Sequence, residues 1–156
     1  MTKTLLSIAE LLEELGHPST EKRVAALAHL SERPTEARSG LVALISNVQA
    51  TDIARVWAAI GIGQLGDDES KSASVALVAV LHSGPPVVRW SAIHALGGLR
   101  AEHAVTAIAN HLLDHDEIKG AWFEDDCKVS HAAEAALRQI GTVAALLALT
   151  AVSKSG

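Results

Sequence analysis

Residues 88–99 read Val-Arg-Trp-Ser-Ala-Ile-His-Ala-Leu-Gly-Gly-Leu. At the 100° per residue of an α-helix, Val88, Ala92, Leu96 and Leu99 fall within one arc of the helix surface. The polar side chains of the stretch fall outside that arc. The stretch therefore predicts an amphipathic helix whose apolar face packs against other helices.

This pattern of an arginine, an alanine three residues later and an aliphatic residue four positions further occurs three times. The copies are Arg23, Ala26 and Leu30; Arg55, Ala58 and Ile62; and Arg89, Ala92 and Leu96. Their arginines lie 32 and 34 residues apart, and a fourth copy at 130–141, which lacks the arginine, follows after 41 residues. A period of this length indicates an array of helical repeats.

A second apolar helix pattern follows each copy. Its expected core positions are Leu41, Leu44 and Ile45; Val75, Val78 and Ala79; Val105, Ile108 and Leu112; and Val143, Leu146 and Leu147. Helix breaks are expected near Gly16, Pro34, Thr51, Gly66, Gly84, Arg100 and Gly141, because glycine ends helices and proline opens them. We predict about nine helices, no strand, and one domain, 1–156, with repeats at about 19–50, 52–83, 85–116 and 127–153 and an insertion at 117–126.

The motif Val88-Arg89-x-x-Ala92-x-x-Ala95-Leu96-Gly97-x-Leu99 resembles the HEAT-like repeat of the phycobilisome lyase (PBS lyase) type. It is echoed at 55–65 and 129–141, so the resemblance covers most of the chain and is strongest in the two central repeats. It implies an all-α, right-handed α-solenoid of about four helix pairs after an N-terminal helix. The family includes scaffolds, bilin lyase subunits, inhibitors, immunity proteins and a few metalloenzymes, so the resemblance does not decide a function.

Composition excludes several classes of function. Of the 156 residues, 49% are hydrophobic but only 3% are aromatic, and the net charge is −5. That acidic balance disfavours nucleic-acid binding, which needs a basic surface. The uncharged stretch 142–153 is shorter than the roughly 20 residues that cross a bilayer, and the single cysteine, Cys127, fits a reducing compartment. We expect a cytoplasmic protein that binds neither membranes nor nucleic acid.

The repeated arginines Arg23, Arg55 and Arg89 admit two interpretations. Guanidinium groups bind carboxylates and phosphates, so the row could bind an anion. In HEAT-like proteins, however, this arginine usually connects neighbouring repeats through loop acids or carbonyl oxygens. We favour the structural role, with Asp52 as a suitable partner.

Two pairs of potential metal ligands have the i, i+4 spacing that places both on one side of a helix, as a zinc site requires. They are His111 with His115, and Cys127 with His131. Helical geometry does not direct the two pairs toward each other, so solvated helix ends are the favoured interpretation. Deoxyhypusine hydroxylases, which share the repeat, bind iron through His-Glu dipeptides, and this chain has no such dipeptide.

Two surfaces are candidates for binding a partner. The first is an outer stripe one and five positions after each arginine, which includes Val56, Ile60 and Trp90 and should face solvent. The second is the insertion, where Trp122 and Phe123 precede Glu124, Asp125 and Asp126. Adjacent aromatics beside acids suit a basic partner. Alternatively, the two aromatics cover the groove between the third and fourth repeats, and an aspartate caps the next helix.

We expect a non-enzymatic module without cofactors that binds another protein, as a scaffold, adaptor, inhibitor or immunity-type binder. A second copy of the chain is one candidate partner, which would give a homo-oligomer. The alternative is an accessory protein of the bilin lyase kind, or a metal-dependent ligand-handling protein. That alternative rests on the family resemblance and on the histidines.

Overall fold

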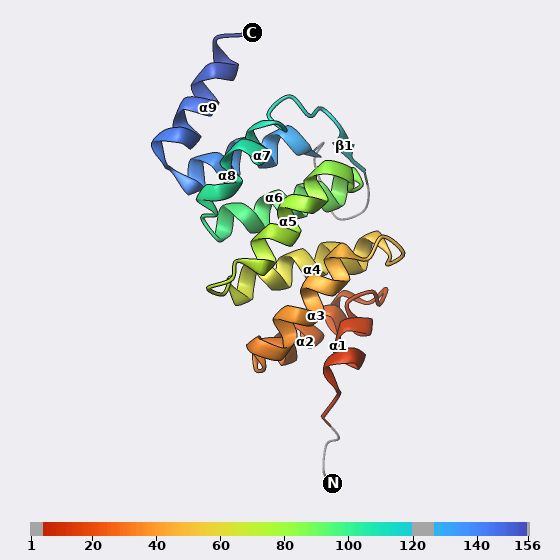
Figure 1. Ribbon diagram of the computed structural model, residues 1–156. Helices are drawn as coiled ribbons and strands as arrows, with labels where there is room; N and C mark the ends of the chain where they lie inside the picture. The colour runs from red at the N-terminus through yellow and green to blue at the C-terminus, as the bar shows by residue number, and fades with distance from the viewer. Residues whose placement is uncertain (1–4, 120–126, 156) are drawn as a thin grey trace.

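The computed structural model describes residues 5–119 and 127–155 and is an α-solenoid. The elements are α1 (Ile8–Glu14), α2 (Thr20–Ser31), α3 (Pro34–Ser46), α4 (Asp52–Leu65), α5 (Ser72–Ser83), α6 (Pro86–Gly98), a 3₁₀ turn (Glu102–Ala104), α7 (Val105–Ala109), β1 (Glu117–Ile118), β2 (Cys127–Lys128), α8 (Val129–Ile140) and α9 (Val143–Ser153). The helices stack along one axis (Figure 1). The predicted all-α solenoid class is confirmed.

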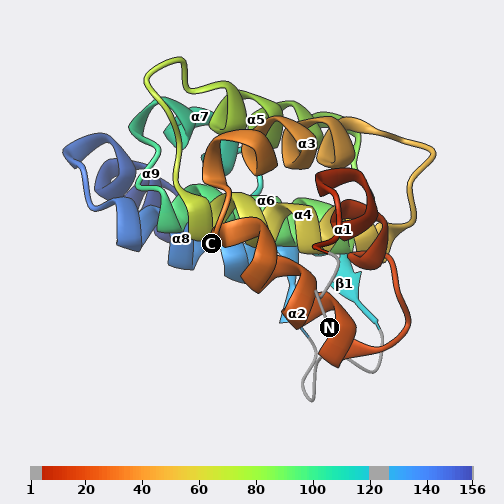
Figure 2. The ribbon, with the colours of Figure 1, turned by 90° about the horizontal axis from the view of Figure 1, so that it is seen from below.

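The helices form two layers. One contains α2, α4, α6 and α8 side by side, and the other contains α1, α3, α5 and α7 (Figure 2). Each helix of the first layer also packs against the helix that precedes it in the chain. The central helices α4 and α6 are therefore covered from several directions, whereas α9 projects from the end of the stack (Figure 1).

Local sequence explains where the helices begin and end. Side-chain oxygens of Ser7, Thr51 and Thr142 accept backbone N–H groups at three helix starts. Pro34 and Pro86 occupy the first position of α3 and α6, where the missing N–H costs nothing. Gly66 and Gly141 end α4 and α8 with φ of 77° and 70°, a conformation that glycine adopts without strain.

Small residues allow the first-layer helices to approach closely. A Cβ atom on Gly97 of α6 would lie 2.9 Å from both Cα and Cβ of Ala136 in α8. A Cβ atom on Gly63 of α4 would lie 3.5 Å from Cα of Ala95 in α6. The predicted core positions Val88, Ala92 and Leu96 are fully buried between these helices. An alanine-rich composition with few aromatics is therefore what this packing requires.

The prediction of no strand is wrong at one place. Glu117 pairs with Lys128 and Ile118 pairs with Cys127 in a short antiparallel ladder. Ile118 is buried, and backbone groups beside a buried residue need hydrogen-bond partners, which the returning chain supplies. The ladder continues into α8 through a hydrogen bond from the Val129 N–H to the Asp116 carbonyl.

Two of the second helices do not bury the face that their sequence predicts. In α5, Val75 is 56% exposed, and in α9, Val143, Leu146 and Leu147 are 75%, 48% and 63% exposed. The fully buried residue of α9 is Ala145. Both helices are apolar on nearly every side, so sequence periodicity cannot identify the packed face.

No helix within the described residues is both long enough and apolar enough to span a membrane.

Candidate functional site

Each of the three repeated arginines donates hydrogen bonds to backbone carbonyl oxygens. These carbonyls lie at the end of the preceding helix or in the segment that follows it. Arg23 Nη1 donates to the carbonyls of His17, and of Pro18 at 2.8 Å. Arg55 Nε donates to the Ile45 carbonyl at 3.0 Å, in the last turn of α3. The final carbonyls of a helix lack partners within it and favour a cation, so these contacts stabilise the junctions between repeats. The predicted structural role fits, but the partner of Arg55 is this carbonyl and not Asp52.

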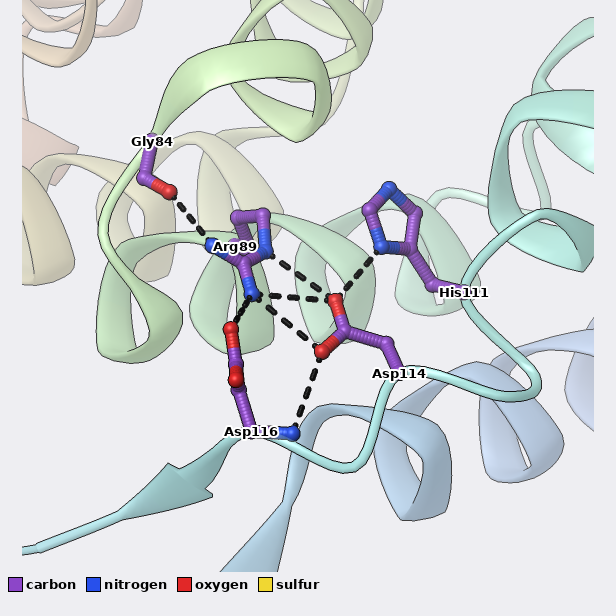
Figure 3. Close-up of polar contacts among 5 residues, drawn as sticks. All are labelled: Gly84, Arg89, His111, Asp114 and Asp116. Carbon is purple, nitrogen blue, oxygen red and sulfur yellow. Dashed lines mark hydrogen bonds and ion pairs between the residues drawn. The ribbon is translucent and has the colours of Figure 1, made fainter.

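Arg89 makes a larger polar cluster (Figure 3). Its Nη1 donates to the Gly84 carbonyl at 2.7 Å, while Nη2 donates to Asp114 Oδ2 at 3.0 Å and to Asp116 Oδ2 at 2.6 Å. The Nδ1 atom of His111 lies 2.8 Å from Asp114 Oδ2. The side chains of Arg89 and Asp114 are each only 14% exposed, so the ion pair is largely shielded from water.

Competing effects set the pKa of Asp114. Burial raises it, but hydrogen bonds from His111 and from the Asp116 N–H, together with the Arg89 guanidinium, hold it below its ordinary value. The carboxylate is therefore stable in its charged form. The cluster attaches the chain at 111–116 to α6 and so fixes the position of β1.

The ladder formed by β1 and β2 holds Ile118 beside Cys127. The segment between them contains the predicted binding residues Trp122, Phe123, Glu124, Asp125 and Asp126, which lie outside the described residues. Binding through this segment stays a prediction.

The predicted outer stripe is only partly exposed. Val56 is 5% exposed and belongs to the core, because α4 is covered by α2 on one side and α6 on the other. Its assignment to the surface is wrong. Ile60 and Trp90 are half-buried and pack against the core. The Trp90 ring also makes an edge contact with His94 at 4.2 Å between ring centres, and burial lowers the pKa of His94.

The candidate metal ligands do not share helices as expected. α7 ends at Ala109, so His111 and His115 both lie beyond it. Cys127 lies in β2, whereas His131 lies in α8. The i, i+4 argument for both pairs is therefore wrong. Among residues 5–119 and 127–155, no group of three or more His, Cys, Asp or Glu side chains could hold a metal ion.

A groove of about 600 Å³ lies between α8 and α9. Its apolar lining consists of Leu112, Leu146, Leu149 and Val152. Ser130, Thr150 and Ser153 add hydroxyl groups, and Glu134 and Arg138 form an ion pair on the α8 side. Leu146 is 48% exposed in this lining, and the next residue on α9, Leu147, is 63% exposed beside it. An exposed apolar surface of this kind typically marks a contact site.

Sequence reasoning missed this groove. The uncharged stretch from Thr142 to Ser153 is the available signal, but the helical pattern assigns Val143, Leu146 and Leu147 to the core, whereas the structure exposes them. The helix is too uniformly apolar to show which side remains uncovered.

Comparison with known proteins agrees with the repeat pattern. Residues 88–114, which span α6, α7 and the turn that carries Asp114, match the family model of the PBS lyase HEAT-like repeat. Among curated proteins, none matches the chain closely enough to count as a relative.

Proposed function

The chain carries a PBS lyase HEAT-like repeat at residues 88–114, and from this premise we propose that it is a non-enzymatic protein-binding module whose contact surface is the groove between α8 and α9. Repeats of this kind generally mediate protein–protein interaction, because stacked helix pairs present an extended surface. The cytoplasm is the proposed location, in keeping with the single cysteine.

The observation that carries the proposal is the exposure of α9. Leu147 is 63% exposed and Leu146 is 48% exposed, beside a groove whose lining is mainly apolar. Covering such side chains with a protein surface removes apolar area from water, which contributes roughly 25 cal/mol per Å². A polar small molecule would gain little from this lining, so a protein is the better occupant. The ligand-handling alternative has no comparable support, since the helical geometry of its histidine pairs is lost.

The test is a pull-down with the tagged full chain from its host, followed by mass spectrometry. Leu146→Asp places a charge in the apolar lining of the groove and should abolish capture of any specific partner. Val48→Asp is the matched control, because Val48 is 72% exposed but lies in the turn after α3, away from the groove. Far-UV circular dichroism should show the same helicity for all three proteins. If the wild type and both variants capture the same proteins equally, the groove is not the contact surface.

A further inference from the structure

We propose that the groove between α8 and α9 binds a second copy of this chain, so that two molecules associate about a two-fold axis through their α8–α9 ends. This inference rests on the proposed function, because it names the partner of the same groove.

The first argument is the character of α9. Its eleven residues, Val143–Ser153, include no charged side chain, and Ala145 is its buried residue. A helix that is apolar on all sides is normally enclosed by protein, and α9 contacts α7 and α8 but projects from the stack (Figure 1). The uncovered side therefore needs an apolar partner surface, which α9 of another copy provides.

The second argument is the charge pattern of the groove. The chain carries a net charge of −5, so two copies repel each other unless they meet through a neutral surface. The groove has one acid, Glu134, and one base, Arg138, which lie four residues apart on α8. When two α8 helices cross antiparallel on a two-fold axis, Glu134 of each copy faces Arg138 of the other. The groove is thus complementary to itself in charge, as an isologous contact requires.

The opposite end of the solenoid is a poorer match for α9. A groove of about 310 Å³ lies between α1 and α2 and is lined in part by Glu14, Lys22 and His29. It has about half the volume of the α8–α9 groove and three ionisable side chains, of which Glu14 and Lys22 already form an ion pair at 3.9 Å. Burying the uncharged α9 there would desolvate these groups without giving them a new partner. This difference favours the two-fold arrangement over head-to-tail stacking.

The size of the contact sets the expected affinity. A helix of eleven residues is about 16 Å long, so a contact made by α8 and α9 alone is smaller than the roughly 800 Å² per partner of standard stable interfaces. We therefore expect a reversible dimer with a dissociation constant in the micromolar range.

The experiment is sedimentation equilibrium of the full chain over roughly 50 nM to 1 mM, a range that brackets the expected dissociation constant. The mass should rise from 16.3 kDa toward twice that value. Leu146→Asp should stay monomeric throughout the range, because it places a charge in the groove, and Val48→Asp should dimerise like the wild type.

Charge reversal tests the orientation. Glu134→Arg and Arg138→Glu should each weaken self-association at least tenfold, because each places like charges opposite each other. An equimolar mixture of the two variants should restore dimerisation, since every acid then faces a base. The side chains of Glu134 and Arg138 are 45% and 64% exposed, so neither charge reversal should unfold the chain.

A constant mass of 16.3 kDa up to 1 mM would overturn the second-copy inference. If Leu146→Asp nevertheless loses a captured protein in the pull-down, the proposed function stands with a different partner. The two-fold arrangement would be overturned if the mass continued to rise beyond that of a dimer. It would also be overturned if the mixture of Glu134→Arg and Arg138→Glu failed to dimerise.

Discussion

The close approach of α6 and α8 predicts opposite effects for the same substitution at two adjacent glycines. A Cβ atom at Gly97 would lie 2.9 Å from Cα and Cβ of Ala136 and 3.1 Å from Gln139 Oε1. At Gly98 nothing lies within 4 Å of the added atom. Gly97→Ala therefore forces two helices apart, whereas Gly98→Ala meets no obstacle.

The magnitude follows from two competing effects. Adding a methyl group to a tightly packed core costs about 1–3 kcal/mol, and here the obstructing atoms include backbone, which cannot rotate away. Replacing glycine by alanine in a helix contributes about 0.5–1 kcal/mol in favour of folding. Gly97→Ala should thus lower the free energy of unfolding by about 1–2 kcal/mol. Gly98→Ala should raise it by up to about 1 kcal/mol.

Thermal and urea unfolding, followed by circular dichroism at 222 nm, measure both variants under identical conditions. For a chain of this size, the loss at Gly97 corresponds to a fall in Tm of about 2–8 °C, while Tm of Gly98→Ala should equal or exceed that of the wild type. If Gly97→Ala is as stable as Gly98→Ala, α6 and α8 do not approach at this point, and the account of first-layer packing is wrong.

Two further predictions concern a strained turn and a buried carboxylate. Arg100 follows α6 with φ of 50°, a conformation that favours glycine, so Arg100→Gly should raise the free energy of unfolding by about 1 kcal/mol. Gly141 has φ of 70°, so Gly141→Ala should lower the free energy of unfolding by about 1 kcal/mol. The urea midpoints of the two variants and the wild type measure both effects. Because folding lowers the pKa of Asp114, its charge stabilises the fold above the unfolded pKa of about 4, and that contribution is lost as pH falls through the folded value. Asp114→Asn should therefore be less stable than the wild type at pH 7 and should lose less stability between pH 5 and pH 2. Parallel acid titrations of the two proteins test this. If the wild type loses no more stability than the variant over that range, the explanation is refuted.

The helix ends and the core of the first-layer helices could be predicted from sequence because their signals are local. Pro34, Pro86, Gly66 and Gly141 lie where the structure starts or ends helices. Each of these residues acts through its own backbone geometry, whatever the tertiary context.

Burial of the remaining positions depends on neighbours that are distant in sequence. A helical wheel with one core face assigns Val56 to solvent, but α4 lies between two helices of its layer and is buried on that side as well. The Arg89–Asp114 pair spans 25 residues, and Asp114 reaches the arginine only because α7 ends early, at Ala109. The chain turns after Ala109 through short i to i−3 hydrogen bonds, which no pattern of apolar residues predicts.

The absence of the repeated arginine from the fourth copy is connected with the groove. The corresponding position is Ser130, whose N–H donates to the Asp114 carbonyl and whose side chain lines the groove. In the preceding copies, Arg55 and Arg89 reach back to carbonyls at the ends of α3 and α5 and bind each pair to the previous one. A serine is too short to make such a contact, and the start of α8 is held through the backbone hydrogen bond from Ser130 to Asp114. The position at which the sequence repeat breaks therefore contributes to the lining of the groove in which we place the partner.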